Sequence, residues 1–438
     1  MAQKPLYTIP INDRPPHGPW ASKIFFPIIF TLAQLGINSA QFLFVPLLLV
    51  PFVGKRLFSH AIGWTKDGYG RLLIAITVLF GPTQFAITTD TPPSHGESLV
   101  ERDVNGQVVK INLPDRLVIM ANHQAYLDWI YIWILACYAG HSPGLIILLK
   151  ASLKNIPVVG WGMRFFNFIF LRRSWAADRS NLTLALRQLG KEAQSGQENS
   201  ETSRLLPLRK RSPLWLLIFP EGTIGSDEER VKSIKYAKRE GIDDFATLLH
   251  PRSTGLLFCL RTLLPQIPDL NLLDITIGYP GVPFGKYAQN WYGLFSVFLK
   301  SVPPPTVYLH LHIYSHLGEP ECKIPSLVPT QSPRISGLSA DWGLANAEEA
   351  RAFELWLRNV WTAKERRMEQ FYESQRFAHP HEIVPIQQMY VGYFVNARIN
   401  VDRLYCRKWY HWISAVGGGG LGTVVLLAFC IWFALCRR

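Results

Sequence analysis

The chain has 438 residues, of which 48% are hydrophobic, 13% aromatic and only 18% charged. Lys and Arg number 45 against 32 Asp and Glu, which gives a net charge of +13. This composition excludes a disordered polar chain and favours a protein that associates with membranes. The sequence contains no zinc-finger spacing, no basic region with heptads and no RNA-recognition signature. We therefore expect the positive charge to face membrane phosphate and phosphorylated substrates rather than nucleic acid.

The N-terminal part of the chain divides into a polar segment and two apolar runs. Residues 1–21 are polar and rich in proline, which predicts a flexible N-terminus rather than a signal peptide. Residues 22–90 are expected to form membrane-associated helices. The first run, Ile24 to Phe52, is long enough to cross a bilayer, but its polar middle leaves open a tilted span or a hairpin in one leaflet. The second run, Leu72 to Ile87, is broken by Gly81-Pro82 and is expected to lie in the interface or to complete a hairpin. The polar positions of the first run are Gln34, Asn38, Ser39 and Gln41.

The central region, residues 100–320, is expected to be an α/β catalytic domain. Short apolar runs indicate buried strands, and helical patterns alternate with them. Leucines at helical spacing from Leu182 to Leu189 mark one helix, with Asp178 as its candidate cap. Residues 194–213 are polar and are expected to form an exposed loop. The expected strands are residues 117–120, 145–149, 214–219 and 274–279.

Two further helices are expected after this domain. Residues 345–378 contain the clearest amphipathic pattern, over 346–375, which predicts a helix that packs against the core or lies on the membrane surface. Residues 412–436 are expected to be a transmembrane helix, because an apolar run there precedes two arginines. Gly417 to Gly422 match a dinucleotide-binding glycine pattern, but no strand precedes them, so we interpret the match as accidental.

The segment from Asn122 to Asp128 carries the residues best suited to catalysis. A neutral histidine can take the proton of an alcohol as the alcohol attacks, and a carboxylate on the other ring nitrogen fixes the tautomer. No GxSxG elbow is present, so the substrate itself would supply the hydroxyl. Residues five apart on a helix point about 140° away from each other. His123 should therefore lie in a turn before the helix that carries Asp128. In isolation, a capping aspartate and a structural histidine are the simpler interpretation of this pair.

A second segment, Phe219 to Thr223, changes that interpretation. It has the sequence FPEGT and follows a predicted buried strand. A strand that ends in a turn containing glycine can present backbone amides to a phosphate. For this segment alone, an ordinary strand-to-loop turn is the alternative.

Together the two segments resemble the signature of the family of glycerol-3-phosphate and lysophospholipid acyltransferases. Its NHxxxxD box is present as Asn122 to Asp128 and its xPEGT box as Phe219 to Thr223. An arginine-bearing box between them matches Phe170 to Arg173, and Asp274 to Pro280 is the candidate for a looser fourth box. The resemblance covers residues 115–285. Residues 250–255 and 371–374 resemble the branch that contains lysocardiolipin acyltransferase and the epsilon-type 1-acylglycerol-3-phosphate acyltransferase.

The resemblance implies a role for each residue of the two boxes. His123 would be the general base and Asp128 its orienting partner. Because a carboxylate repels a phosphate, we expect Glu221 to orient an arginine or an acceptor hydroxyl. The residues implied in substrate binding are Asn122, Arg173, Pro220, Glu221, Gly222 and Thr223.

The resemblance also implies the reaction and its surroundings. It indicates an O-acyltransferase that uses acyl-CoA as co-substrate to acylate a lysophospholipid, with direct attack of the acceptor hydroxyl on the thioester. Lysophosphatidic acid, lysophosphatidylinositol and lysocardiolipin are all open as acceptors. The lipid bilayer is the expected partner and the endoplasmic reticulum the expected location, with a mitochondrial membrane as the alternative. Two other functions stay open, a hydrolase or transacylase that uses the same His/Asp pair, and a non-catalytic lipid-binding protein.

The remaining cysteines and histidines do not indicate a metal site, and no cofactor is expected. The six cysteines are scattered without CxxC spacing. His310 and His312 alternate on a predicted strand, and His379 and His381 flank Pro380. We interpret these histidines as core or surface residues.

Overall fold

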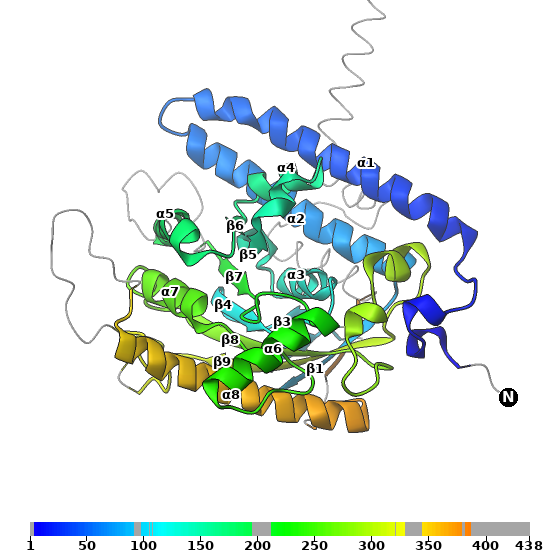
Figure 1. Ribbon diagram of the computed structural model, residues 1–438. Coiled ribbons are helices and arrows are strands. Elements are labelled where there is room, and N and C mark those ends of the chain that lie inside the picture. The colour runs from blue at the N-terminus through cyan, green and yellow to red at the C-terminus, as the bar shows by residue number, and fades with distance from the viewer. Residues whose placement is uncertain are drawn as a thin grey trace, which may run out of the picture.

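Eight strands form the central sheet in this computed structural model, which describes residues 4–91, 98–104, 106, 108–194, 212–319, 321–328, 344–378 and 382–386. The strands are β1 (Gln84–Thr89), β4 (Arg116–Ala121), β5 (Leu145–Lys150), β6 (Ile169–Leu171), β7 (Leu214–Ile218), β8 (Asn271–Gly278), β9 (Thr306–Tyr314) and β10 (Glu382–Pro385). Their order is β10-β1-β9-β8-β4-β7-β5-β6 (Figure 1). The strands from β8 to β6 are all parallel, whereas β9 is antiparallel to β8. A separate antiparallel pair joins β2 (Val100–Arg102) to β3 (Val108–Ile111).

Helices cover both faces of the sheet. They are α1 (Trp20–Phe44), α2 (Gly54–Phe80), α3 (Asp128–Tyr138), α4 (Val159–Phe165), α5 (Trp175–Gln194), α6 (Asp227–Glu240), α7 (Ser253–Leu263) and α8 (Ala347–Ser374). One hydrophobic cluster joins α2 and α3 to the sheet, and a second joins α5, α7 and α8 to it. Alternate side chains of β4 contribute to the two clusters. Leu117 and Ile119 belong to the first cluster, and Val118 and Met120 belong to the second. The chain is thus a three-layered α/β structure, and its continuous apolar strands suit a sheet buried on both faces.

The four strands expected from the sequence are confirmed and differ only at their ends. Of the two placements expected for the apolar run from Leu72 to Ile87, the structure shows the hairpin, which the run completes with α1. Its first half is the end of α2, buried against the sheet domain, and its last residues enter the sheet as β1. Gly81 ends the helix between these two halves. The run therefore belongs to the protein core and not to the membrane interface. The sequence does not reveal this, because a buried helix and a helix that faces lipid have similar hydropathy.

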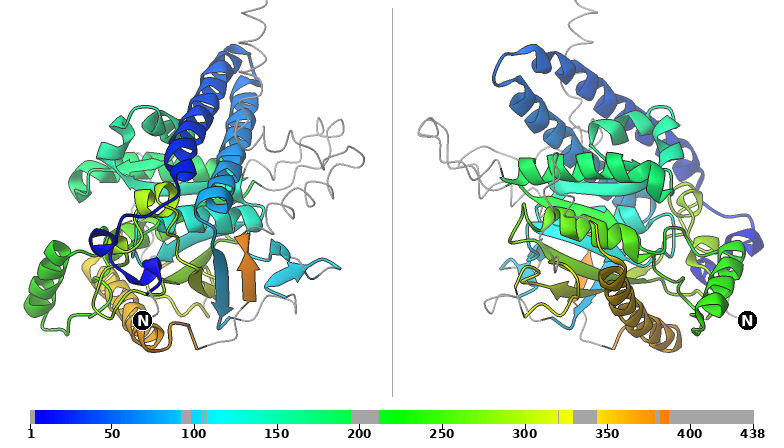
Figure 2. Two further views of the ribbon diagram at one scale, coloured as in Figure 1. Left: turned by 90° about the vertical axis from the view of Figure 1, so that its right-hand side faces the viewer. Right: turned by 60° about the vertical axis from the view of Figure 1, so that its left-hand side comes forward.

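Helices α1 and α2 run side by side as a hairpin on one side of the sheet, opposite α8 (Figures 1 and 2). The stretch Trp20–Leu49 is long and apolar enough to cross a bilayer, judged by length and composition alone. Its polar residues are turned inward, because Gln34, Asn38 and Gln41 are all buried. The outer face of α1 exposes Ile24, Phe25, Ile28, Leu32, Leu35, Phe42 and Leu43. The hairpin arrangement thus accounts for the polar middle of this apolar run.

The contact between α1 and α4 involves an unusual backbone conformation. Asn38 Nδ2 donates to the carbonyl oxygen of Val158 over 2.7 Å. Val158 immediately precedes α4 and has a φ of +65°, which a β-branched residue rarely adopts. The buried amide of Asn38 therefore fixes the first turn of α4 in a strained conformation.

The N-terminal residues differ from the flexible segment expected over 1–21. Residues 6–8 and 11–13 form two 3₁₀ turns. Arg14 is buried, and its guanidinium donates to Ser296 Oγ over 2.5 Å and to the Trp291 carbonyl over 2.7 Å. These bonds attach the segment to the catalytic domain, which composition alone does not reveal.

Helix α8 confirms the amphipathic pattern and packs against the sheet, with Phe353, Trp361 and Phe371 in the second hydrophobic cluster. Helix α5 begins three residues before Asp178, so the aspartate is not its N-terminal cap. The Asp178 carboxylate instead accepts the backbone N–H groups of residues 172 and 174 in the preceding turn. The expected transmembrane helix 412–436, most of the loop 194–213, and His379 and His381 lie outside the described residues.

Candidate active site

The predicted site residues lie along one edge of the sheet. Because β4, β5, β6, β7 and β8 are parallel, their carboxyl ends face the same edge. His123 follows β4, the segment from Phe219 to Thr223 follows β7, and Arg173 follows β6. Ligands of parallel α/β sheets bind outside this edge. The topology therefore brings together segments that are far apart in the sequence.

His123 and Asp128 contact each other directly. His123 lies in the turn after β4, and Asp128 is the first residue of α3, as the spacing of the pair predicts. His123 Nδ1 lies 2.8 Å from Asp128 Oδ2. The same oxygen accepts the backbone N–H groups of Gln124 and Ala125, over 2.7 and 3.0 Å. Tyr279 donates its hydroxyl to Asp128 Oδ1 over 2.6 Å. Four donors thus hold a completely buried carboxylate.

This arrangement determines which ring nitrogen can act as a base. A carboxylate only accepts hydrogen bonds, so the proton of a neutral His123 ring lies on Nδ1. The lone pair is then on Nε2, for which the described residues supply no hydrogen-bond partner. The His123 side chain is 17% exposed, whereas that of Asp128 is inaccessible. Burial and the charge of Asp128 raise the pKa of Tyr279 well above its ordinary value, so the tyrosine stays a donor.

The FPEGT segment packs directly on His123. The Phe219 ring stacks on the imidazole, with ring centroids 4.1 Å apart and planes within 16°. Stacking leaves the ring edge, which carries both nitrogens, free to reach Asp128 on one side and a substrate on the other. The second box therefore orients the imidazole supplied by the first.

Glu221 is buried rather than at the surface. Burial raises the pKa of Glu221 to about 8, although Lys364, the His123 amide and Trp361 all act in the opposite direction. Its Oε1 atom has no hydrogen-bond partner among the described residues.

Gly222 forms the tight turn of the same segment. Its φ is +73°, and its N–H donates to the Phe219 carbonyl over 2.9 Å. The guanidinium of Arg252 lies against this turn, about 3.5 Å from the position a Gly222 side chain would take. The Arg252 backbone N–H donates to the carbonyl of Pro220 over 2.8 Å. An exposed cation thus adjoins the turn that contains Gly222 and the half-buried Thr223.

Comparisons with known proteins identify the family of this chain. The sequence model of the acyltransferase family matches residues 105–278. A 2-acyl-1-lysophosphatidylinositol acyltransferase of Saccharomyces cerevisiae is 32% identical over 333 residues, which are 73% of this chain and 77% of the relative. The chain belongs to the lysophospholipid acyltransferase family. It is therefore an O-acyltransferase.

Two further relatives have related names. Lysocardiolipin acyltransferase 1 of Danio rerio is 29% identical, over 61% of this chain and 55% of the relative. Lysophosphatidylinositol acyltransferase 10 of Caenorhabditis elegans is 30% identical, over 62% of this chain and 56% of the relative. No solved structure matches the chain.

Two predicted substrate-binding residues of the acyltransferase lie in different surroundings. The Asn122 side chain is buried and exchanges two hydrogen bonds with the backbone of Ile277 on β8, over 3.0 and 2.7 Å. It thereby ties the catalytic turn to the neighbouring strand. Arg173 is exposed and has a φ of +64° in the turn after β6. Three strand spacings, ~14 Å in total, separate β6 from β4.

Sequence reasoning missed Tyr279 and Arg252 as members of the site. Tyr279 is the penultimate residue of the looser fourth box, and a tyrosine at the carboxyl end of an expected strand is the available signal. Arg252 lies in a segment that indicated only the branch of the family. Both residues reach the site through tertiary contacts with the two boxes.

The histidines considered for metal binding have a structural explanation. His312 Nδ1 lies 2.6 Å from Asp90 Oδ1, and His310 Nε2 lies 3.4 Å from Asp90 Oδ2. Burial by itself would raise the pKa of Asp90, but the hydrogen bonds and charges of His310 and His312 hold this pKa well below its usual range. The cluster ties β1 to β9.

Proposed function

We propose that the acyltransferase transfers a fatty acyl group from acyl-CoA to a free glycerol hydroxyl of a lysophospholipid, with His123 as general base. The observation that carries the proposal is the His123–Asp128 pair, in which Nε2 is the accessible basic atom. Lysophosphatidylinositol is the acceptor we favour, because two relatives in different organisms carry that activity in their names.

The proposed reaction needs no covalent enzyme intermediate. Nε2 of His123 takes the proton of the acceptor hydroxyl while the oxygen attacks the thioester carbonyl carbon. The carbon–oxygen bond forms, the tetrahedral intermediate collapses, and the carbon–sulfur bond breaks. The imidazolium returns the proton to the leaving thiolate, which departs as the CoA thiol. Asp128 stabilises the imidazolium between these two proton transfers.

Two arginines are suited to bind the acceptor phosphate. Arg252 adjoins the Gly222 turn, and Arg173 lies at the same sheet edge. A guanidinium can donate two parallel hydrogen bonds to a phosphate. A phosphate bound near these arginines would leave the glycerol hydroxyl close to His123, because both arginines lie at the sheet edge that also carries His123.

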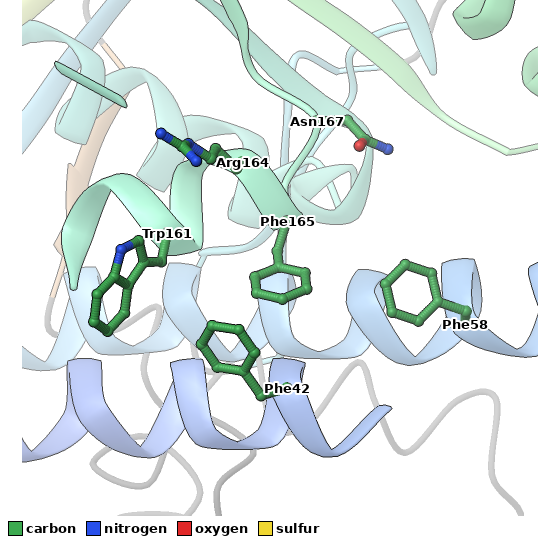
Figure 3. Close-up of a pocket in the computed structure, with 6 residues that line it drawn as sticks. All are labelled: Phe42, Phe58, Trp161, Arg164, Phe165 and Asn167. Carbon is green, nitrogen blue, oxygen red and sulfur yellow. The ribbon is translucent and has the colours of Figure 1, made fainter. Parts of the chain in front are cut away.

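The outer surface of the hairpin supports attachment to a bilayer. The exposed face of α1 is mostly apolar, with Lys23 and Thr31 as exposed polar residues. Beside it, α1, α2 and α4 line an open aromatic hollow of about 380 Å³, with Arg164 at its margin (Figure 3). Its lining residues are Phe42, Phe58, Trp161, Arg164, Phe165 and Asn167. Such a surface suits lipid chains next to anionic headgroups. We further propose the endoplasmic reticulum membrane as its location, which fractionation against mitochondrial markers would test.

The function is tested with purified full-length protein in mixed micelles. Labelled oleoyl-CoA is incubated with a panel of lysophospholipids, and labelled phospholipid and free fatty acid are measured separately. We expect label in the phospholipid, greatest with lysophosphatidylinositol, and none with His123→Ala. Release of free fatty acid without an acceptor would indicate a hydrolase. An active His123→Ala variant would refute the mechanism.

A further inference from the structure

One residue outside both signature boxes, Gln289, forms a bridge between their turns. It lies in a 3₁₀ turn, Ala288–Asn290, that follows β8. Its backbone N–H donates to the Gln124 carbonyl oxygen over 3.1 Å. Its side-chain amide donates to the Gly225 carbonyl oxygen over 2.6 Å. Gln289 is therefore bonded to the turn of the first box and to the loop that continues the second.

Both ends of this bridge lie close to groups of the active site. The N–H of Gln124 donates to Asp128 Oδ2 over 2.7 Å, so Gln124 is bonded to the catalytic carboxylate as well as to the bridge. Gly225 is the second residue after the FPEGT segment. The ring of Tyr287 lies 3.0 Å from the position that a Gly225 side chain would take. The bridging turn thus packs tightly on the second box and bonds directly to the first.

The bridging turn is itself held by the N-terminal residues. Arg14 is buried, and its guanidinium donates to the Trp291 carbonyl oxygen over 2.7 Å and to Ser296 Oγ over 2.5 Å. Its Nε atom donates to the Ile9 carbonyl oxygen over 2.8 Å, which fixes the guanidinium in turn. Trp291 is only two residues after Gln289. Neither Arg14 nor Gln289 belongs to residues 105–278, which match the family model.

A bridge of this kind fixes the separation of two subsites. In the proposed function, the base is His123 on the first box, and the acceptor phosphate binds beside the second box, next to Arg252. A lysophospholipid has its phosphate on an end carbon of glycerol, so its free hydroxyl lies either on the adjacent carbon or on the far carbon. An enzyme can prefer one of these positions only if its base and its phosphate site keep a constant separation.

We infer that Gln289 determines the positional selectivity of acyl transfer, because it holds the phosphate-binding turn at a fixed distance from His123. Gln289 is a positioning residue that acts through the two turns, and Arg14 supports it from the N-terminal segment. The inference rests on the proposed function. It adds a residue that discriminates between two isomers of one lysophospholipid.

The test is a competition between two isomers of lysophosphatidylinositol. One isomer has its free hydroxyl on the carbon next to the phosphate-bearing carbon, and the other has it on the far carbon. Both are mixed with labelled oleoyl-CoA and purified full-length protein, and the position of the label in the product is determined. The ratio of the two products does not depend on how much of the protein is folded, so a simple loss of stability leaves it unchanged.

Gln289→Met keeps the backbone bond to Gln124 and removes only the bond to Gly225. We expect the wild type to prefer one isomer and the variant to lose most of that preference, up to roughly tenfold, the size of one lost hydrogen bond. Arg14→Met should change the ratio in the same direction, and Arg14→Lys should change it less, because an ammonium can still donate to the Trp291 carbonyl. Gln289→Met and Arg14→Met together should lower the preference no further than Gln289→Met alone.

The matched control is Asn290→Met in the same turn. The Asn290 side chain is exposed, so this variant should keep the wild-type product ratio. A wild type without a preference, an unchanged ratio in Gln289→Met, or an equal change in the control would overturn the inference. An inactive His123→Ala variant would still support the proposed function in each of these cases. An active His123→Ala variant would refute both.

Discussion

The charge of Asp128 is the feature whose contribution to the rate is most directly measurable. Asp128→Asn keeps the size of the side chain and most of its hydrogen bonds. The amide oxygen can accept the three N–H groups that now reach Oδ2, and the amide nitrogen can donate to the hydroxyl oxygen of Tyr279. We therefore expect the variant to fold and His123 to keep its proton on Nδ1. Only the negative charge next to the imidazolium is lost.

The size of this loss follows from the separation of the two charges. His123 Nδ1 and Asp128 Oδ2 are 2.8 Å apart, so the centres of charge are about 4 Å apart. At an effective dielectric constant of about 20, this pair is worth about 4 kcal/mol. If the imidazolium is nearly complete in the transition state, kcat/KM should decrease about 10³-fold.

The assay is transfer of labelled oleate from oleoyl-CoA to lysophosphatidylinositol, with thermal unfolding as a check of the fold. The matched control is Asp269→Asn, which removes a charge from the Arg116–Asp269 pair at the opposite edge of the sheet. We expect its kcat/KM to stay within about threefold of the wild type, because the exposed Asp269 carboxylate lies at the end of the strands opposite to His123. An Asp128→Asn variant that is folded and less than tenfold impaired would refute the electrostatic argument.

Three other variants test the surroundings of the pair. Tyr279→Phe removes the hydroxyl that donates to Asp128 over 2.6 Å. A hydrogen bond to a charged group is worth about 1.5–3 kcal/mol, so kcat should decrease roughly 10- to 100-fold. An unchanged kcat in steady-state assays would contradict this role. Lys364→Met should lower the unfolding free energy by about 3–5 kcal/mol in denaturant titrations, because Asp274 is left unpaired. If the further replacement of Asp274 by Asn restores none of the lost stability, this explanation fails. The pKa of Glu221 rises from an ordinary value of 4.5 to about 8 in the folded chain, so the folded state holds this proton more tightly and stability should fall as the pH rises between those values. The unfolding free energy should fall by up to about 1.4 kcal/mol per pH unit in the wild type, and this slope should be missing in Glu221→Gln. Equal slopes in the two proteins would show that the Glu221 carboxyl group does not titrate in this range.

The contact between His123 and Asp128 agrees with the sequence-based expectation because its geometry is local. His123 and Asp128 are joined by one turn between a strand and a helix, and five residues leave few ways to bring them into contact. Tyr279 is 151 residues from Asp128, and Gln289 lies in a turn after the matched region. Their positions depend on which strands pair and on where a loop packs, which no local pattern contains.

The membrane-associated region was predicted less well, for a physical reason. Apolar side chains have the same periodicity whether they face lipid or a protein core. The end of α2 and strand β1 were thus grouped with the first apolar run, although they belong to the core of the catalytic domain. The polar residues of α1 were the informative signal, because a buried amide such as Asn38 needs a partner that protein can supply.

The bond between Asn38 and Val158 has a consequence for how the protein can be divided. Without Asn38, Val158 loses one of the bonds that hold it at positive φ, beside those of Val159 N–H to Pro157 and Gly162 N–H to Val158, so we expect the first turn of α4 to loosen. Helix α4 leads directly into β6 and the turn of Arg173. A truncated catalytic domain that lacks α1 would therefore lose more than the apolar surface of that helix. Excision of the hairpin would act at a distance on the edge of the sheet where the acceptor phosphate is expected, so we expect the smallest working unit of this enzyme to include its first helix.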